Sequence, residues 1–347
     1  MRNIIISNKN RLPEVHFTRV GCRGVIVKDD KILLSGMVMP DIPGEVFYLI
    51  PGGGQDEGET LEQCCEREVR EETGLKVRPK EHFLTLTEFY EDNCFVNHYF
   101  TCEIEGEAAT SLTETEIAYQ LKAEWMPLDE AILRFGRYEE YMTVDEGWSS
   151  AYLREYTALV EFIRFCNETE GLPEYHELHH RNGTPTGRIL QKHRKDAPGD
   201  YFLHSIIVLK TADSPRPGEG EGCYIMQQRS LKARYYAGKW DVTGGGVKAY
   251  ETYEEAACRE AKEELGLEID PSSLKEFHKY YADWADGSGL ILKVFACRAQ
   301  VPEEGFCFNP MEVNDVKVVP FHVFKEYVLD HNDEAFGRAL DRIEAEV

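Results

Sequence analysis

The chain has 347 residues, enough for two domains of ordinary size that each bury a core of their own. Hydrophobic residues make up 42% and charged residues 29%, a composition typical of a folded, soluble protein. The net charge of −24 argues against a nucleic-acid backbone or an anionic membrane as the main partner, and an anionic substrate would need cations between itself and the protein.

The first half of the chain contains strand-like runs on both sides of a glycine-rich segment. The stretch GCRGVIVKDDKILLSG holds two such runs around Asp29–Asp30 and predicts a hairpin. After the glycine-rich segment, HFLTLTEFYEDNCFVNHYFTCEIEG is again strand-like, and a long helix is expected around Ser149–Glu168. The polar, turn-rich segment that follows places a boundary near residues 167–175, so we predict domains at 1–170 and 171–347.

The second half repeats this order of elements. A second hairpin is expected from LHSIIVLK, the polar loop TADSPRPGEGEG and the run CYIMQQR. The stretch KEFHKYYADWADGSGLILKVFACRAQ is strand-like, and a helix closes this half. The two halves are therefore predicted to share one order of strands and helices.

One segment is shared almost residue by residue. GGGQDEGETLEQCCEREVREETGL begins at Gly52, and GGGVKAYETYEEAACREAKEELGL begins at Gly244. The two align without gaps at a constant offset of 192 residues. An offset of domain length indicates a duplicated domain, since solenoid repeats have periods of about 20–50 residues.

Each copy of this segment predicts a capped helix of roughly 13 residues. Thr60 followed by Gln63 has the pattern of a capping box, and Thr252 and Glu255 repeat it. Gly74, like its counterpart Gly266, falls where a left-handed C-terminal cap is expected.

The glutamates of this helix lie in an unusual place. At about 100° per residue, Leu61, Cys65 and Val69 form the apolar stripe, and the glutamates Glu68, Glu71 and Glu72 fall on or beside it. The solvated face is left to Glu62, Gln63, Glu66 and Arg70. The second copy gives the same wheel, with Tyr253, Ala257 and Ala261 on the stripe.

These glutamates point to a cation site. A glutamate-rich helix is usually a solvated surface, but here the wheel turns like charges toward the core, where they repel one another and are costly to bury. Hard divalent cations with oxygen ligands neutralise such a cluster. A cation site therefore explains the pattern better than a solvated face does.

The pattern Gly-x5-Glu-x7-Arg-Glu-(apolar)-x-Glu-Glu-x-Gly-(apolar) resembles the Nudix box, and both copies satisfy it, with Ala261 at an apolar place that is usually larger. The resemblance implies an α/β protein of two Nudix-fold α/β/α sandwich domains in tandem, each with a mixed sheet between helices. It also implies hydrolysis of a pyrophosphate bond in a nucleoside diphosphate linked to a group X, with Mg²⁺ or Mn²⁺ as cofactor.

The resemblance also implies which residues act. The implied metal ligands are Gly52 (through its carbonyl), Glu68, Glu71 and Glu72 in the first copy and Gly244, Glu260, Glu263 and Glu264 in the second. The implied catalytic residues are Arg67, Glu68, Glu71, Arg259, Glu260 and Glu263. Arg67 would pair with Glu59, and Arg259 with Glu251, to hold loop to helix; the plain alternative is a pair with the glutamate four residues on. Which glutamate takes the proton from water stays open.

The second half has a further resemblance, to the branch of the family that includes isopentenyl diphosphate isomerase. It is carried by HRNGTPTGRILQKHRKDAPGDYFLHSIIVL and QQRSLKARYYAGKWDVTGGG. The isomerase uses a cysteine in the loop after the tryptophan, but Asp241–Gly246 contains none, and the box acids here are complete. We therefore expect a relative that hydrolyses, with isomerase activity as the alternative.

Residues that select the substrate are less defined by the sequence. Arg229 and Lys232 are candidates for phosphate contacts or for surface ion pairs. The aromatic residues that would stack on a base or pack in a core are Tyr48, Trp125, Tyr235, Tyr236 and Trp240. The histidines that would bind metal, were the second half isomerase-like, are His179, His180 and His204.

The ten cysteines include no Cys-x-x-Cys pair, so we expect reduced, mostly buried thiols. With no signal-peptide core and no apolar run near ~20 residues, the cytoplasm is the expected location. Together these features predict a tandem Nudix hydrolase that acts on a nucleotide sugar, a nucleoside triphosphate or a similar small molecule. We expect no nucleic acid or membrane partner. The chain is expected to form a homodimer or to pair its own two domains, and the sequence leaves this choice open. The alternative from another class is a nucleotide sensor with one non-catalytic domain, which two complete boxes disfavour.

Overall fold

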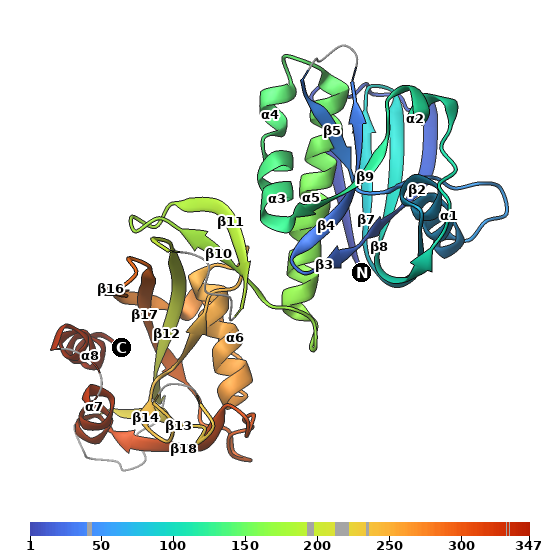
Figure 1. Cartoon of the computed structure of the whole chain (residues 1–347). Coiled ribbons are helices and arrows are strands. Elements are labelled where there is room, and N and C mark those ends of the chain that lie inside the picture. The colour runs from blue at the N-terminus through green and yellow to red at the C-terminus, as the bar shows by residue number, and fades with distance from the viewer. Residues whose placement is uncertain (40–43, 193–197, 212–221, 234–235, 331, 333) are drawn as a thin grey trace. The chain divides into compact units, whose positions relative to one another are not determined.

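A computed structural model describes the chain except residues 40–43, 193–197, 212–221, 234–235, 331 and 333. The chain divides into two compact units, residues 1–175 with 187–191 and residues 176–186 with 192–347 (Figure 1). The predicted domains, 1–170 and 171–347, are continuous segments, whereas residues 187–191 of the first unit interrupt the second.

The first unit is built from two sheets and flanking helices. Its elements are β1 Arg2–Ser7, β2 Phe17–Val25, β3 Val27–Lys28, β4 Lys31–Val38, β5 Val46–Leu49, β6 Gly52–Gly54, α1 Leu61–Thr73, β7 Leu75–Tyr90, β8 Asn93–Glu107, α2 Glu114–Ala118, β9 Lys122–Pro127, α3 Leu128–Gly136, α4 Tyr138–Tyr141 and α5 Glu146–Glu168. One sheet has the order β1-β7-β8-β2-β6 and is mixed, because β1–β7 and β2–β8 are parallel and the other pairs antiparallel. In the other sheet, β4 pairs with β3, β5 and β9.

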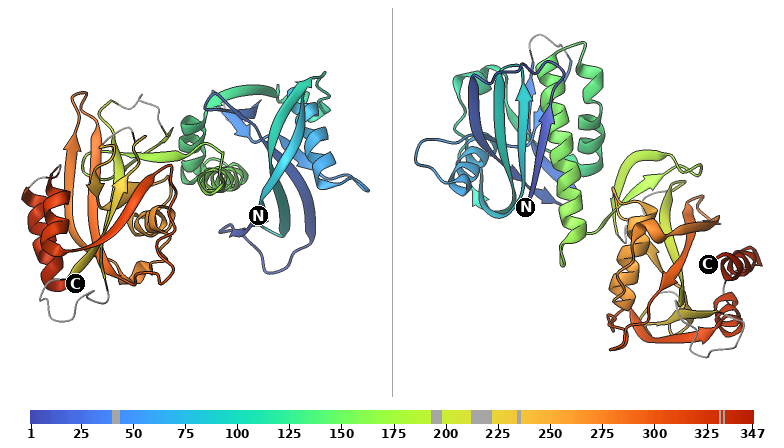
Figure 2. Two further views of the ribbon diagram at one scale, coloured as in Figure 1. Left: turned by 90° about the horizontal axis from the view of Figure 1, so that it is seen from below. Right: turned by 180° about the vertical axis from the view of Figure 1, so that it is seen from behind.

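Helices cover both faces of the first mixed sheet. Helix α1 packs on β2 and β7, and α5 lies against β7 on the opposite face (Figures 1 and 2). Cys22 of β2, Phe100 of β8 and Val69 of α1 belong to one buried apolar cluster between sheet and helix. The expected α/β/α sandwich is confirmed for this unit.

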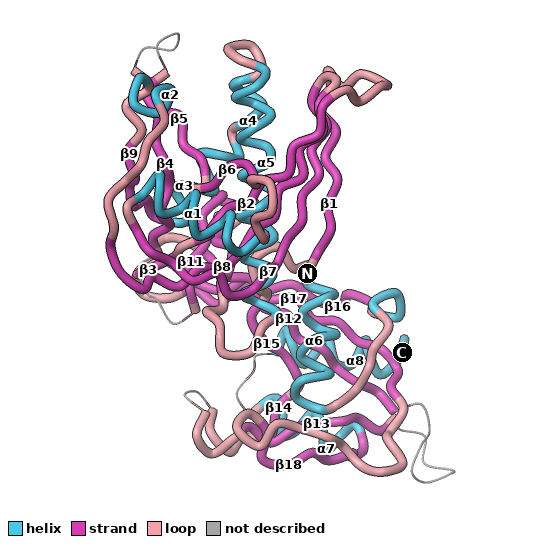
Figure 3. The backbone as a smooth tube through the Cα atoms, turned by 90° about the vertical axis from the view of Figure 1, so that its right-hand side faces the viewer, coloured by secondary structure: helices cyan, strands magenta, loops and turns pink. Residues whose placement is uncertain are grey.

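The second half repeats the plan with one large sheet. Its elements are β10 Tyr175–His179, β11 Pro185–Gln191, β12 Tyr201–Thr211, β13 Cys223–Arg229, β14 Trp240–Asp241, β15 Thr243–Gly246, α6 Tyr253–Leu265, a 3₁₀ turn Pro271–Ser273, β16 Lys275–Asp283, β17 Gly289–Ala299, β18 Val313–Pro320, α7 Phe321–Leu329 and α8 Glu334–Glu346. Strand β12 runs parallel to β17 and antiparallel to β10, β13 and β15. The strands of both units can be followed in Figure 3.

The sheet of the second unit is also covered on both faces. Helix α6 packs on one face, where Ala257 and Ala261 join a cluster with Ile207 of β12. Helices α7 and α8 cover the other face, where Phe324 and Leu340 are buried. The mixed sheet between helices is therefore confirmed here as well (Figure 2).

Turn chemistry explains the first predicted hairpin. Asp29 and Asp30 join β3 to β4 with φ values of 52° and 60°, and Lys28 pairs with Lys31 across the turn. Positive φ at both central residues is the backbone that matches the twist of a two-residue hairpin, and Asp tolerates it better than most residues. The second predicted hairpin, β12–β13, is present, but its loop lies outside the described residues.

Capping residues set the ends of the long helices. Thr60 and Gln63 form the predicted capping box of α1, Gly74 closes it in the left-handed conformation, and α6 has the same caps. Helix α5 begins three residues before the predicted start, because the Asp145 side chain accepts a hydrogen bond from the Trp148 N–H. All ten cysteines are free and most are buried. No helix among the described residues is long and apolar enough to cross a bilayer.

Candidate active site

The glycines of each repeated segment allow close approach between loop, strand and helix. Strand β6 pairs with β2 so that Gly52 lies opposite Arg23 and Gly53 opposite Cys22. Gly52 has a φ of 150°, and a Cβ there would collide with the Cys22 carbonyl. A Cβ on Gly53 would meet the Glu68 carboxylate and displace it. The backbone therefore requires glycine at Gly52, and the observed position of Glu68 requires it at Gly53.

An arginine ties this loop to helix α1. The Arg67 guanidinium donates to both carboxylate oxygens of Glu59, at 2.8 and 2.9 Å, and to the Gly54 carbonyl at 2.9 Å. The predicted pair is therefore present, and its bidentate form is the strong one. Arg67 also donates to Glu68 at 2.8 Å and to Glu71 at 3.4 Å, so the pair four residues on forms as well. Arg67 holds the pKa of Glu59 below its ordinary value.

The three glutamates of α1 have different partners. Glu68 and Glu71 are held by Arg67, whereas Glu72 accepts hydrogen bonds from the Ser35 hydroxyl at 2.6 Å and the Gly52 N–H at 3.3 Å. The residues predicted to be solvated, Glu62, Gln63, Glu66 and Arg70, are all exposed. The helical wheel therefore describes the true orientation of α1.

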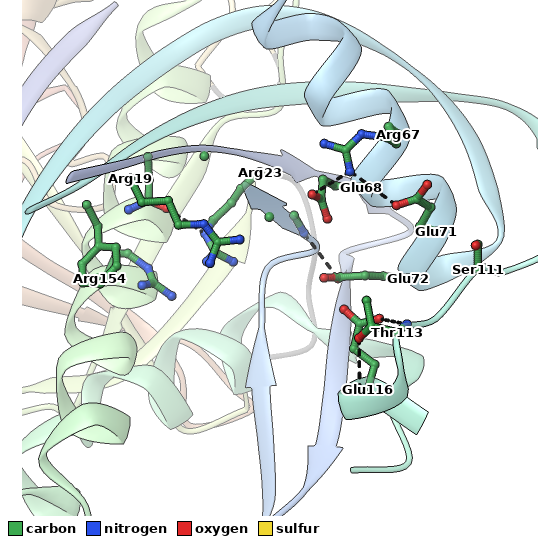
Figure 4. Close-up of a pocket in the computed structure, with 15 residues that line it drawn as sticks. Arg19, Arg23, Arg67, Glu68, Glu71, Glu72, Ser111, Thr113, Glu116 and Arg154 are labelled. Carbon is green, nitrogen blue, oxygen red and sulfur yellow. Dashed lines mark hydrogen bonds and ion pairs between the residues drawn. The ribbon is translucent and has the colours of Figure 1, made fainter. Parts of the chain in front are cut away.

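These glutamates line a cavity of about 370 Å³ in the first unit. Figure 4 shows Arg19, Arg23 and Arg154 on one side of it and the glutamates on the other. The full lining is Arg19, Gly21, Arg23, Gly52, Gly53, Arg67, Glu68, Glu71, Glu72, Phe95, Asn97, Ser111, Thr113, Glu116 and Arg154. The cavity thus has an acidic wall that faces a cationic wall.

Burial makes the acidic wall costly to ionise. It raises the pKa of Glu72 to about 7, against the smaller opposing effect of the Ser35 hydrogen bond. Burial also raises the pKa of Glu68, opposed by Arg67. Carboxylates whose pKa is raised by desolvation lack sufficient positive charge nearby, which a divalent cation would supply.

The carboxylate oxygens of the three glutamates are suitable ligands for a hard cation, but in this structure they do not point toward one common position. Among the residues that the structure describes, no three His, Cys, Asp or Glu side chains lie close enough together to share one metal ion. Glu68 and Glu71 are turned to Arg67, and Glu72 is turned to Ser35. A common ion would therefore require Glu68 and Glu71 to exchange Arg67 for the ion.

The second unit repeats the loop and helix. Arg259 donates to both oxygens of Glu251, at 2.9 and 3.1 Å, to the Gly246 carbonyl at 2.9 Å, and to Glu260 and Glu263. A Cβ on Gly245 would meet the Glu260 carboxylate, as in the first copy.

The last box glutamate of the second unit has a different partner. Gln227 of β13 donates to Glu264 at 2.7 Å, and the Gly244 N–H donates at 3.2 Å. Burial raises the pKa of Glu264 well above its ordinary value and also raises that of Glu260. Glu263 is turned outward, with 46% of its side chain exposed, against 29% for Glu71. The second acidic cluster is thus more open to solvent at Glu263 than the first is at Glu71.

The other candidates have varied surroundings. Tyr48 is buried and donates to Glu124, and Lys317 lies over the Trp240 ring at 4.3 Å, so both aromatic residues have structural contacts. The buried His179 contacts the Glu177 carbonyl. Lys232, Tyr236 and His180 are exposed, Trp125 is 39% exposed, and Tyr235 lies outside the described residues.

His204 and Arg229 stand apart from these. Burial lowers the pKa of His204 to about 4, and Arg229 is close enough to lower it further. The charge of Arg229 also lowers the pKa of Glu264, so Arg229 lies near the second acidic cluster. A residue that contacts the phosphate of a substrate would have to lie there.

Sequence reasoning missed the cationic wall and the partners of the last glutamates. Arg19, Gly21 and Arg23 alternate along β2, which is the period that places side chains on one face of a strand. That period was a usable signal. Nothing local to Ser35 or Gln227 indicates that either reaches a glutamate 37 residues further along the chain.

The NUDIX domain family matches residues 17–144 and 214–340, which together exceed half of the chain. The chain therefore belongs to this family and carries its domain twice.

Among curated relatives, an uncharacterised Nudix hydrolase of Pseudomonas aeruginosa is 38% identical over 84 residues, 24% of this chain and 47% of that protein. A nucleoside triphosphatase NudI of Enterobacter is 30% identical over 78 residues, 22% of this chain and 50% of that protein. The chain spans about half the length of these relatives. A Deinococcus radiodurans crystal structure matches 49% of this chain and 99% of its own, at 19% identity and a TM-score of 0.37.

Proposed function

We propose that the chain is a tandem hydrolase that cleaves a pyrophosphate bond in a small nucleoside diphosphate-X substrate, such as a nucleoside triphosphate or nucleotide sugar, with Mg²⁺ or Mn²⁺. One observation carries the proposal: the first-unit cavity places the three box glutamates opposite Arg19, Arg23 and Arg154. The NudI relatives, named as nucleoside triphosphatases, support the same substrate class.

The two walls divide the chemistry between them. A divalent cation held at the acidic wall would supply charge neutralisation for the pyrophosphate and would make a water molecule easier to deprotonate. Glu68, Glu71 and Glu72, with the Gly52 carbonyl, would hold it. Positive charge on the facing wall would bind the remaining phosphate charge, which the protein's net charge of −24 would otherwise repel.

Two features of α1 prepare the acids for this task. Arg67 fixes the loop to the helix through Glu59 and the Gly54 carbonyl, two residues after Gly52. A carboxylate beside the reacting water accepts its proton, and Glu68 and Glu71 are both positioned on the cavity wall to do so.

We propose the same chemistry at Glu260, Glu263 and Glu264, with Arg259 in the role of Arg67. The repeated loop geometry supports it. Isomerase activity in the second unit stays the alternative, disfavoured by the absence of cysteine from Asp241–Gly246. The free, mostly buried thiols support a reducing location such as the cytoplasm.

A panel of substrates tests both units. Nucleoside triphosphates, nucleotide sugars and isopentenyl diphosphate would be incubated with Mg²⁺ or Mn²⁺ and with wild type, E72Q, E264Q and the double variant. Each single change is expected to remove the activities of one unit, and the double change all of them. E66Q is the matched control, since Glu66 is an exposed glutamate on the same helix. Full activity of the double variant would contradict the proposal, and conversion of isopentenyl diphosphate without hydrolysis would favour the isomerase.

A further inference from the structure

The cavity of the first unit has a wall that the catalytic proposal leaves partly unused. Arg19, Gly21 and Arg23 share one face of β2, and the parallel register of β2 with β8 places Phe95 beside Arg19 and Asn97 beside Gly21. All five line the cavity. The wall therefore presents, in order along the strands, a guanidinium with an aromatic ring, an amide, and a second guanidinium.

Asn97 carries an unsatisfied donor. Its side-chain oxygen accepts a hydrogen bond from the Arg23 Nε at 3.3 Å, which fixes the orientation of the amide. The Nδ2 group has no hydrogen-bond partner among the described residues, although Asn97 is only 6% exposed. A buried N–H₂ without a partner costs about 1–3 kcal/mol, so it is expected to serve an acceptor that arrives with a ligand.

Arg19 carries an unused positive charge. The Arg23 guanidinium donates to the Ile50 carbonyl at 2.8 Å, and Arg154 is held by Glu88 and Glu155. The Arg19 guanidinium, in contrast, has no ion pair or hydrogen bond with any residue that the structure describes. Its guanidinium lies against Gly54 and within electrostatic reach of Glu68. A free guanidinium that faces the acidic wall suits a phosphate that contacts both walls.

An aromatic surface continues the wall outward from Arg19. The Phe95 ring meets the Phe17 ring edge to face, with centroids 6.3 Å apart, and Phe17 is 50% exposed. Accessible aromatic rings next to a cation provide a stacking surface for the base of a nucleotide.

The second unit lacks this set of groups. Gly54 and Gly246 hold the same place in the two boxes and pair with Gly21 and His204, so the strands can be matched residue by residue. The matched residues are Phe202 for Arg19, Ile206 for Arg23, Leu290 for Phe95 and Leu292 for Asn97. Ile206 and Leu292 are buried in an apolar cluster. The unsatisfied donors therefore belong to the first unit and not to the shared fold.

We propose that Arg19, Asn97 and Phe95 form a subsite of the first unit that recognises the nucleoside-phosphate part of the substrate. The inference rests on the proposed function and names which unit takes nucleotides. Arg19 pairs with a phosphate, the Asn97 amide donates to an oxygen of the nucleotide, and the base stacks on Phe95 and Phe17. The second unit does not bind nucleotides in this way.

The substitutions that test the subsite come from the second unit itself. R19F, N97L and F95L install the matched residues. N97L removes the Asn97 donor without adding charge, whereas N97D keeps the size of Asn97 and replaces its donor with a carboxylate. R78A is the control, because Arg78 is an exposed cation of the same unit paired with Glu103 outside the cavity. Circular dichroism and thermal unfolding check the fold of every variant.

The first measurement is the affinity for ADP, obtained by calorimetry in EDTA. The second is kcat and KM for two substrates, a nucleoside triphosphate and inorganic tripolyphosphate. R19F is expected to weaken ADP at one site per chain roughly tenfold or more and to raise KM for both substrates. N97D and F95L are expected to weaken ADP, and F95L to leave KM for tripolyphosphate unchanged. R78A is expected to match wild type.

Two failures can be told apart. ADP affinities within twofold of wild type in R19F, F95L and N97D would overturn the subsite, even if the protein hydrolyses nucleotides. Tight ADP binding that depends on Arg19, in a protein that hydrolyses none of the substrates, would uphold the subsite and overturn the proposed function.

Discussion

Replacing Glu72 by glutamine should stabilise the first unit when no metal is present. The pKa of the Glu72 carboxyl is raised to about 7 from an ordinary 4.5 because burial penalises its charged form. Glutamine has the same shape and keeps an oxygen that can accept from the Ser35 hydroxyl and the Gly52 N–H. The substitution therefore removes a buried charge and retains its hydrogen bonds.

The sign and size follow from linkage. A carboxyl whose folded-state pKa lies above its unfolded value contributes stability that is complete below about pH 4.5 and lost as pH rises through about 7. The difference corresponds to up to about 3 kcal/mol at pH 8, an upper limit because Glu72 faces a cavity. E72Q should match wild type near pH 4.5 and exceed it in unfolding free energy at pH 8.

Hydrogen exchange by mass spectrometry can measure this in α1 without mixing the two units. Peptides covering residues 61–75 would be followed in EDTA at both pH values for wild type, E72Q and the exposed-site control E66Q. Added Mg²⁺ at pH 8 should protect wild type more than E72Q, because an ion that binds only the folded state stabilises it by mass action. An α1 equally or less protected in E72Q at pH 8 would refute the reasoning.

Three further changes probe the loop and helix geometry. G53A should abolish first-unit turnover, because its Cβ would displace the Glu68 carboxylate; kcat/KM measures this. R67K should lower the melting temperature and first-unit activity, because lysine cannot replace the two hydrogen bonds to Glu59. D145A should destabilise the first unit by about 1 kcal/mol through loss of the α5 cap, in chemical unfolding, and leave KM unchanged.

Each of these changes has a control or a result that would contradict it. Gly106→Ala adds a methyl group where no atom lies within 4 Å, so it should leave activity unchanged while G53A does not. Full activity of R67K would show that a single positive charge suffices to hold the loop. A raised KM in D145A would mean that the start of α5 influences the cavity, where its residue Arg154 lies.

The parts of this protein that could be predicted from sequence are those set by local physics. The caps of α1 at Thr60 and Gly74, its length, and the inward turn of Glu68 and Glu72 follow from residues within one helix. The Arg67–Glu59 pair spans only eight residues and came from the family resemblance. Near neighbours in sequence are bound to meet once the helix forms.

The partners of the same glutamates depend on strand pairing far along the chain. Ser35 contacts Glu72 from strand β4, whose place in the fold is set by its pairing with β5. Asn97 contacts Arg23 because β8 runs parallel to β2. No periodicity within one segment encodes such a register. The cationic wall could be seen as an alternation in β2, but its place opposite α1 could not.

The two units together separate what the box specifies from what it does not. In both copies an arginine–glutamate pair holds the loop to the helix. In both, a glycine also packs against the glutamate that follows this arginine, Glu68 or Glu260. The facing wall differs at every matched position, from Arg19 and Asn97 to Phe202 and Leu292. If, as proposed, the shared loop and helix cleave a pyrophosphate and the facing wall contacts the rest of the substrate, the two copies differ only in what they recognise. A duplicated box with divergent walls should then give one chain two substrate ranges rather than a doubled rate for one. A substrate hydrolysed equally well by E72Q and E264Q would contradict that division.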